Sequence, residues 1–512
     1  MAAGSNKEQA VSIEAGSGEE ESGRSLAGQV GRGAMWAVAA NIVMRFASIA
    51  ITAVLARLLS PEDFGVFAIA LAVFLVVASL AELGMGSAVA RAATEPEDIA
   101  PTVASISILV GTGVGLLMAA FAPALATLLG QPEAAGPIRI LSICVALTGF
   151  FAVPGAQLVR EFRQGRIFLA AIVGFVTANP ILIVLALHGG GAEAFAWSRV
   201  IGQLASGVVF WFSTSHRYLP GWRSDQVKPL LMFGLPLSLA NLVNWTLLNA
   251  DYLILGRLVS AAEVGVYMIA FNVASWSTSV LGSVLNSVVV PALGRVSGDP
   301  PKLRQAITRA GQLVGLVSLP IAAICVGLSD PIIRTIYGDK WIDSIPVLSV
   351  LAVYGAVYAF SLLFVNVLVA TGQTMRLLLI QLGWVVVLVP TMVLGLRHWG
   401  LEGVAWAHVV TIGLVALPAY LLAVRRSTSS GVRALLPVVL RPLSAAVLAG
   451  ATSWLASFLV GPEILRLLVG GLAGGAVYLA LTGALITQQI PARFVPRWVP
   501  TRWRSVEAPE AS

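Results

Sequence analysis

The sequence predicts an all-α integral membrane protein with about 14 transmembrane helices. Hydrophobic residues make up 57% of the 512 residues and charged residues only 11%, whereas soluble chains carry about 25% charged residues. Apolar runs long enough to cross about 30 Å of hydrocarbon alternate with charged, Pro- and Gly-containing segments. No alternation of apolar and polar residues, as a membrane β-barrel requires, extends through the chain. This composition excludes a secreted enzyme, a nucleic-acid-binding protein and a disordered hub.

The apolar runs are the expected helices, and each is bounded by charged residues, Pro or Gly. Their approximate cores in chain order are 34–58, 64–90, 103–129, 138–158, 167–187, 194–214, 230–256, 264–293, 313–328, 347–370, 377–396, 404–424, 445–460 and 464–487. The ninth and the thirteenth runs are the shortest. The longest connection on the side opposite the chain termini, 329–346, is expected to be a solvated loop.

These runs divide the chain into seven expected segments. They are a disordered cytoplasmic tail 1–33, an N-terminal six-helix lobe 34–214, a cytoplasmic linker 215–229, a C-terminal six-helix lobe 230–424, a cytoplasmic loop 425–444, two additional transmembrane helices 445–487, and a basic and aromatic cytoplasmic tail 488–512. The first tail lacks the pattern of a cleaved signal peptide, so the first helix is expected to be an uncleaved signal. The last tail alternates Arg with Phe and Trp, which favours anchoring on anionic membrane lipids.

The distribution of basic residues predicts the orientation. An even number of crossings places both termini on one side, and 23 of the 32 Lys and Arg residues then lie on that side, against seven on the other. Positive charge accumulates on the cytoplasmic side of membrane proteins. Both termini are therefore expected to be cytoplasmic.

An internal repeat with an offset of 200 residues connects the two halves. Seven of 14 positions are identical between 57–70 and 257–270. In each copy a serine, Ser60 or Ser260, precedes an acid at the third following position, which is the pattern of a helix N-cap. Both copies have the same direction, so the halves are expected to be parallel repeats of six helices. Two unrelated hairpins with the same capping residues are the alternative.

Three segments resemble a known family. They are Leu-Leu-Ser-Pro-Glu-Asp-Phe-Gly-Val-Phe at 58–67, Glu-Leu-Gly-Met-Gly-Ser-Ala-Val-Ala-Arg at 82–91 and Phe-Gly-Leu-Pro-Leu at 233–237. They are similar to Wzx-type polysaccharide flippases of the multidrug/oligosaccharidyl-lipid/polysaccharide exporter superfamily. The resemblance implies a multi-pass protein of the bacterial inner membrane, with two six-helix lobes that form a V and two further helices.

The resemblance also implies the cargo and the partners. The cargo would be an undecaprenyl-diphosphate-linked oligosaccharide, moved by alternating access for the export of O-antigen, capsule or exopolysaccharide. Lipid-linked oligosaccharide and membrane lipids are the implied partners, with a polysaccharide polymerase and chain-length machinery as further candidates. The resemblance transfers no catalytic residues.

Polar residues within the apolar runs are the candidate substrate-binding residues. An ionisable group at the bilayer centre costs roughly 2.5 to 3.5 kcal/mol, so Arg45, near the middle of the first run, is the clearest candidate. Its guanidinium is suited to bidentate binding of a diphosphate. A structural partner, such as Glu82, Asp251 or a carbonyl, is the alternative role for Arg45.

The candidates lie on four helical faces. They are Asn41, Arg45 and Ser48 on the first run, Arg199 and Gln203 on the sixth, Asn241, Asn244, Trp245 and Asp251 on the seventh, and Asn272, Ser279 and Asn286 on the eighth. Hydrogen bonds between helices would explain any one Asn or Ser face, and snorkelling would explain Arg199 and Asp251. Together the faces predict a hydrated cavity between the lobes, where amides and hydroxyls match sugar hydroxyls and Trp stacks on a sugar ring.

Motifs for other chemistry are missing from the sequence. There is no P-loop, no His spacing typical of a metal site, no nucleophile elbow and no Cys pair for a metal or disulfide. We therefore expect no cofactor, no metal, no nucleic acid and no enzymatic activity. A drug exporter of the same superfamily and a membrane polysaccharide polymerase are the alternatives. The exporters normally have 12 helices, and a polymerase would need acids or histidines on a larger outer loop.

Overall fold

The computed structural model describes most of the chain. The described residues are 43–83, 96–276, 299–428 and 436–489, with single positions 85, 86, 89, 278, 282, 285 and 293. They form helices and short connections, without a strand among them. The chain divides into two compact units, Met1–Thr52 and Ala53–Ser512. The expected tail 1–33 lies outside the described residues, as does the tail 488–512 beyond residue 489.

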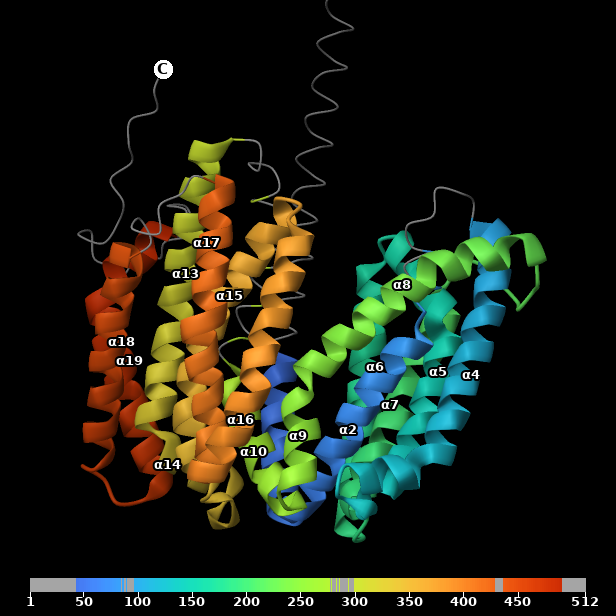
Figure 1. The fold of residues 1–512 in the computed structure, drawn as a ribbon. Coiled ribbons are helices and arrows are strands. Elements are labelled where there is room, and N and C mark those ends of the chain that lie inside the picture. The colour runs from blue at the N-terminus through green and yellow to red at the C-terminus, as the bar shows by residue number, and fades with distance from the viewer. Residues whose placement is uncertain are drawn as a thin grey trace, which may run out of the picture. The chain divides into compact units, whose positions relative to one another are not determined.

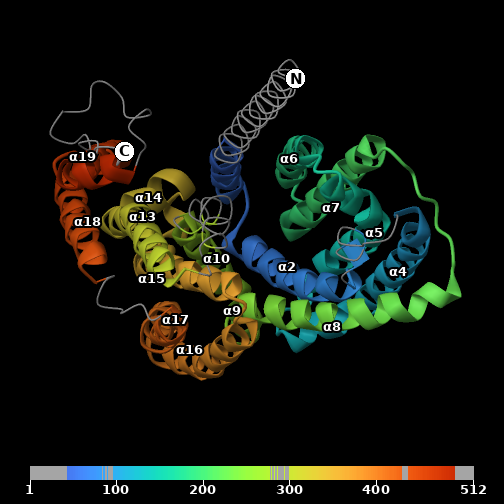
Figure 2. The same cartoon turned by 90° about the horizontal axis from the view of Figure 1, so that it is seen from above.

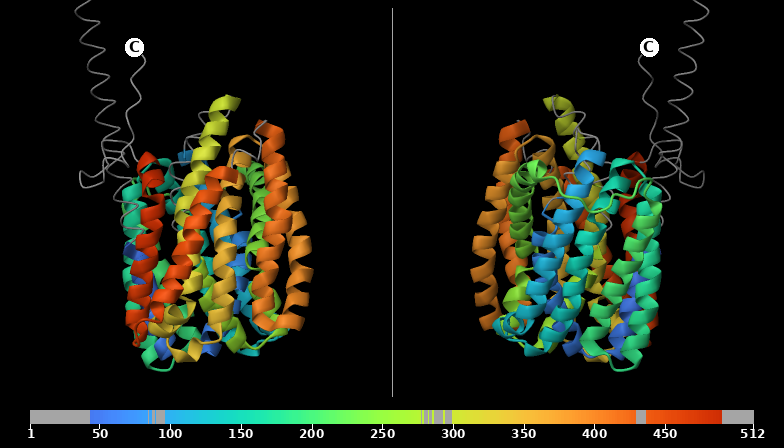
Figure 3. Two further views of the ribbon diagram at one scale, coloured as in Figure 1. Left: turned by 90° about the vertical axis from the view of Figure 1, so that its left-hand side faces the viewer. Right: turned by 90° about the vertical axis from the view of Figure 1, so that its right-hand side faces the viewer.

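The long helices run side by side (Figure 3). After the helical residues 43–58 come α2 (Pro61–Ala81), α4 (Pro96–Leu128), α5 (Ala135–Arg160), α6 (Gln164–Leu187), α7 (Gly191–Ser213), α8 (Ser224–Leu248), α9 (Ala250–Leu258), α10 (Ala261–Ala274), α13 (Pro300–Gly327), α15 (Ser344–Ala370), α16 (Thr374–Thr411), α17 (Leu417–Thr428), α18 (Leu436–Ser457) and α19 (Glu463–Gln489). Within the described part of the chain, ten helical segments are long and apolar enough to cross a membrane. The predicted all-α membrane fold is therefore confirmed, while the total of about 14 crossings stays a prediction.

Three predicted runs have different boundaries in the structure. The seventh run, 230–256, is divided at Asn249 into α8 and α9. The eleventh and twelfth runs both lie in one helical stretch that turns sharply at Trp399 and Gly400. Gly400 has φ of 59° there, a backbone conformation that glycine adopts without strain.

The helices of the second unit form two groups (Figures 1 and 2). The first helix group consists of α2, α4, α5, α6 and α7, and the second helix group consists of α10, α13, α15, α16, α17, α18 and α19. Helix α8 runs along α2 and α4, where Ser238 donates a hydrogen bond to the carbonyls of Ser79 (3.1 Å) and Leu80 (3.2 Å). Helix α8 is thereby fastened to the first group, although it opens the second half of the sequence.

The two copies of the repeat start with the same cap. The Ser60 hydroxyl accepts a hydrogen bond from the Asp63 amide (3.1 Å), and the Asp63 carboxylate accepts one from the Ser60 amide (2.9 Å). Ser260 and Glu263 form the equivalent pair, at 3.3 and 2.9 Å. The predicted caps are therefore confirmed in both copies. The capped helices α2 and α10 also pack against each other and so join the two groups.

The segment 329–346 differs from the solvated loop expected for it. It forms α14 (Ser329–Ile332), the single turns η3 (Ile333–Tyr337) and η4 (Asp339–Trp341), and the start of α15. Trp341 is 0% exposed, and its indole nitrogen donates to the carbonyl of Ala56 (2.9 Å). The expectation was wrong because the polar residues around Trp341 dominate the local composition, whereas the indole packs against a helix distant in sequence.

Neighbouring residues extend this contact. The Lys340 ammonium donates to the carbonyls of Leu59 (2.5 Å) and Arg57 (3.1 Å), and the Arg57 guanidinium donates to the carbonyl of Thr335 (2.7 Å). The last carbonyls of a helix have no partner within that helix, and a cation there is favourable. Burial lowers the pKa of Lys340, and the Asp63 carboxylate opposes that shift. The segment 329–343 thus caps the helix that precedes α2.

Candidate functional site

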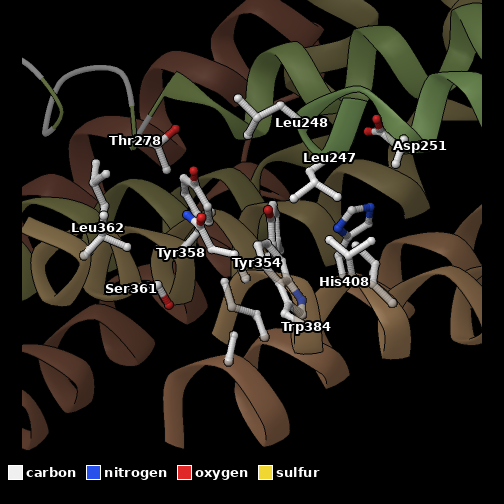
Figure 4. Close-up of a pocket in the computed structure, with 18 of the residues that line it drawn as sticks. Leu247, Leu248, Asp251, Thr278, Tyr354, Tyr358, Ser361, Leu362, Trp384 and His408 are labelled. Carbon is white, nitrogen blue, oxygen red and sulfur yellow. The ribbon is translucent and has the colours of Figure 1, made fainter. Parts of the chain in front are cut away.

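A cavity of about 340 Å³ lies among α8, α9, α10, α15, α16 and α17 (Figure 4). Its aromatic lining residues are Phe271, Tyr354, Tyr358, Trp384 and Tyr420. Its polar lining residues are Asn244, Asp251, Ser275, Thr278, Ser361, Gln381 and His408. We call this cavity the aromatic pocket. No Lys or Arg occurs among its described lining residues.

Three buried side chains at one end of the aromatic pocket form a hydrogen-bonded chain. The Tyr267 hydroxyl donates to Oδ2 of Asp251 (3.2 Å) and lies 3.1 Å from Nε2 of His408. Because a tyrosine hydroxyl has one proton, its second bond requires His408 to donate from Nε2. A neutral His408 then carries a lone pair on Nδ1, which is buried and has no partner among the described residues. One of the residues that line this end of the pocket therefore holds an unused hydrogen-bond acceptor.

The aromatic residues are held in place by their neighbours. The ring of Tyr354 lies 4.9 Å from that of His408 and 5.6 Å from that of Tyr358. The indole nitrogen of Trp384 donates to the Thr411 hydroxyl (3.1 Å). Tyr354 and Tyr358 share a face of α15 because they are four residues apart. The pocket thus has aromatic surfaces with fixed orientations.

A second cavity, of about 460 Å³ and more open, lies between α8 and the first helix group. Its polar lining residues are Glu82, Thr148, Gln203, Ser206 and Asn241, and its aromatic ones are Phe151 and Phe210. The Gln203 amide donates to the carbonyl of Cys144 (2.9 Å) and to the Thr148 hydroxyl (3.0 Å), so part of its capacity for hydrogen bonds is used within the protein. We call this cavity the open cavity.

The structure distributes the candidate residues over several places. Asn244 and Asp251 line the aromatic pocket, and Gln203 and Asn241 line the open cavity. Trp245 lines neither of these two cavities. A role of these five residues in substrate binding stays a prediction.

Two further candidates make contacts within the protein. Asn272 donates to the carbonyl of Met268 in its own helix (3.0 Å). The Arg199 guanidinium lies 5.0 Å from the centre of the Phe74 ring, which is a cation–π contact. Neither contact requires a ligand.

The remaining candidates belong to other parts of the chain. Arg45 and Ser48 lie in the helical residues 43–58, within the unit that ends at Thr52, and both side chains are half-buried. Asn41, Ser279 and Asn286 lie outside the described residues. The expected hydrated cavity that unites all four faces stays a prediction.

The aromatic pocket was not predicted from the sequence. In the sequence, Tyr267, Tyr354, Tyr358 and Trp384 are ordinary aromatic residues of apolar helices, and His408 has no neighbouring His at a metal-site spacing. The spacing of Tyr354 and Tyr358 was an available signal, because it puts two hydroxyl-bearing rings on one helical face. Within the described part of the chain, no three His, Cys, Asp or Glu side chains cluster as metal ligands do.

Comparisons with known proteins give a consistent result. The model of a family described as polysaccharide biosynthesis protein matches residues 54–346. The succinoglycan biosynthesis transport protein ExoT of Rhizobium meliloti (strain 1021) is 27% identical over 84% of this chain and 87% of its own length. The lipopolysaccharide biosynthesis protein WzxC of Escherichia coli (strain K12) is 24% identical over 63% of this chain and 66% of its own length.

Solved structures share the fold. The lipid II flippase MurJ in an inward closed conformation superposes with a TM-score of 0.72, at 16% identity, over 88% of this chain and 99% of that one. An inward-facing multidrug resistance transporter of the MATE family superposes with a TM-score of 0.63, at 20% identity, over 75% of this chain and 94% of that one. These similarities show that the helices have the same arrangement as in those two proteins.

Proposed function

Because the chain belongs to the polysaccharide biosynthesis protein family, we propose that it is a flippase that moves an undecaprenyl-diphosphate-linked oligosaccharide across the bacterial inner membrane. The family match over residues 54–346 is the observation that carries this proposal. The similarity to a succinoglycan transport protein over most of both chains supports it. The exported product would be an O-antigen, a capsule or an exopolysaccharide.

The helix arrangement supports transport by alternating access. Two helix groups of one unit meet where the repeated helices α2 and α10 pack against each other. A carrier of this kind works by moving one group of helices against the other around a binding region, which is then exposed on alternate sides. No enzymatic step is part of this mechanism, and the transport role of the relatives supports a protein that is not an enzyme.

The distribution of basic residues supports one orientation. With both termini in the cytoplasm, Ser60, Ser260 and the segment 329–343 lie on the outer side. The contacts that join the second helix group to Ala56, Arg57 and Leu59 would then close the outer side. A polysaccharide polymerase and chain-length machinery, which would receive the cargo there, are the proposed protein partners.

The chemistry of the cargo suits a divided binding region. The diphosphate needs cations, and the candidate for this role is Arg45, whose guanidinium can form paired hydrogen bonds with phosphate oxygens. The sugars need amides, hydroxyls and aromatic faces, which the two cavities can supply, Asn241 and Asn244 among their lining residues. Trp245, which lines neither cavity, can supply a further aromatic face. The prenyl chain stays in the lipid, so only the polar head group passes through the protein.

Deletion of the gene tests the proposal and separates it from its alternatives. Loss of a flippase leaves radiolabelled lipid-linked oligosaccharide in the cytoplasmic leaflet of the membrane. Accumulation of unpolymerised oligosaccharide in the outer leaflet would instead indicate a polymerase. A change in dye efflux with normal polysaccharide export would indicate a drug exporter, and it would overturn the proposal.

A further inference from the structure

We infer that the aromatic pocket binds a neutral sugar ring of the cargo, at a place separate from the diphosphate. This inference rests on the proposed function and assigns a position to one part of the substrate. Four properties of the pocket support it: its size, its aromatic faces, its hydrogen-bonding groups and its charge.

The size suits a small part of the oligosaccharide. A volume of about 340 Å³ lies near the lower end of the range of ligand pockets, about 300 to 1,000 Å³. The lining residues come from seven helical elements of one unit, which are α8, α9, α10, α15, α16, η5 (Ile412–Ala416) and α17. One or two sugar rings therefore fit the available space, whereas a complete oligosaccharide does not.

Aromatic rings form much of the lining. Tyr354, Tyr358 and Trp384 present ring faces and edges from α15 and α16 (Figure 4). The apolar C–H face of a pyranose packs against such rings, while its hydroxyls remain at the edge for hydrogen bonds. An aromatic pocket with polar groups at its margin matches this two-sided chemistry.

The polar groups complement hydroxyls. Nδ1 of His408 is a buried acceptor without a partner among the described residues, and the His408 side chain is 5% exposed. An unsatisfied buried polar atom costs about 1 to 3 kcal/mol, and a ligand hydroxyl that donates to Nδ1 would remove this cost. Asn244 and Gln381 offer amides that both donate and accept.

The charge of the pocket disfavours binding of the diphosphate in it. Asp251 is the only charged side chain among the described lining residues, and it is an acid. A phosphate in this enclosed space would meet a like charge and find no cation, which is strongly unfavourable where water is scarce. A neutral sugar carries no such penalty.

Photo-crosslinking in living cells tests the inference. The photoreactive analogue p-benzoylphenylalanine replaces Tyr358 in the full-length protein, in a strain that makes the polysaccharide. After irradiation the protein is purified and stained for attached glycan. The matched control carries the same analogue at Leu472, which is 74% exposed on α19 and does not line the aromatic pocket. A third variant carries it at Phe210 in the open cavity.

Glycan attached through position 358 and absent at position 472 is the expected result. Absence of glycan at position 358 overturns the inference, whether or not position 210 captures the cargo. The deletion strain measures the proposed function independently, so a failure of the inference is distinguishable from a failure of the function.

Substitution of Trp384 provides a second measurement. Trp384→Phe keeps an aromatic face, whereas Trp384→Leu removes it. We expect export by Trp384→Leu to fall by roughly three- to tenfold, as the loss of an aromatic contact implies, and export by Trp384→Phe to fall less. The control Trp399→Leu changes an exposed Trp outside the pocket. Equal export by the Leu and Phe variants of Trp384, at equal amounts of protein, would refute a stacking role.

Discussion

Gly65 and Gly265 occupy the same position in the two repeats, and each lies against the helix of the other. A Cβ atom on Gly65 would stand 2.9 Å from the backbone nitrogen of Gly265, and a Cβ atom on Gly265 would stand 3.1 Å from that of Gly65. Each would also collide with the carbonyl oxygen of the first residue of the other helix, Ala261 or Pro61. The contact between α2 and α10 is therefore reciprocal and requires both glycines.

We expect Gly65→Ala and Gly265→Ala each to destabilise this contact. The added methyl group meets backbone atoms, which cannot move aside as a side chain would, and overpacking typically costs about 1 to 3 kcal/mol. The melting temperature of the purified protein in detergent should fall for both variants. Gly113→Ala in α4 is the matched control, because a Cβ there meets no atom within 4 Å. A fall of similar size in the control would show that the contact between α2 and α10 is no more sensitive to an added methyl group than an uncrowded position in α4.

Trp341 is expected to contribute to stability through both its volume and its indole nitrogen. Trp341→Phe removes the donor to the Ala56 carbonyl and should cost about 1 to 3 kcal/mol. Trp341→Ala also leaves a cavity and should cost about 3 to 5 kcal/mol. Thermal unfolding followed by fluorescence measures both variants. A Phe variant as unstable as the Ala variant would assign the whole effect to the lost hydrogen bond and would contradict the packing contribution.

The two caps should contribute equally. Ser60→Ala and Ser260→Ala each remove one N-cap, which is worth about 0.5 to 2 kcal/mol. Because the geometry is the same in both copies, the two melting temperatures should fall by similar amounts, and Ser→Asp at either position should restore most of the loss. Ser444→Ala, whose hydroxyl bonds only to a carbonyl of its own helix, is the control.

The chain Asp251–Tyr267–His408 predicts a cost for removing its central hydroxyl. Tyr267→Phe leaves Oδ2 of Asp251 and Nε2 of His408 without their shared partner in a buried place, at a cost of about 1 to 3 kcal/mol for each unsatisfied group. Asp251→Asn combined with Tyr267→Phe should be less than additive, because the two side chains interact directly. A double-mutant cycle on thermal stability checks this, and strict additivity would contradict the hydrogen bond.

Arg45 is the predicted cation for the diphosphate. Arg45→Ala should abolish polymer export without preventing membrane insertion, and Arg45→Lys should retain part of the activity, because it keeps the charge but loses the paired donors. Polymer on the cell surface and protein in the membrane fraction are the two measurements. Normal export by Arg45→Ala would remove Arg45 from the mechanism.

Local rules were sufficient for the caps and for most helices. Ser60 and Ser260 were identified because a cap depends on residues three positions apart, and the apolar runs were identified because a span depends on composition. The break at Asn249 was not predictable in this way, since Pro236 lies within the unbroken α8 while Asn249 carries no strong helix-breaking signal. Trp341 and the aromatic pocket were missed for a related reason. Their surroundings come from helices far apart in the sequence, and no local pattern records which helices meet.

Helix α8 contacts both α2 and the aromatic pocket, and it ends directly after the second contact. Ser238 ties it to the carbonyls of Ser79 and Leu80, Asn244 and Leu247 form part of the pocket wall, and Asn249 ends it. A displacement of α2 would therefore be transmitted along α8 to the pocket wall where we place the sugar. Binding of the sugar and rearrangement of the helices would then be coupled, because the same helix contacts both α2 and the aromatic pocket.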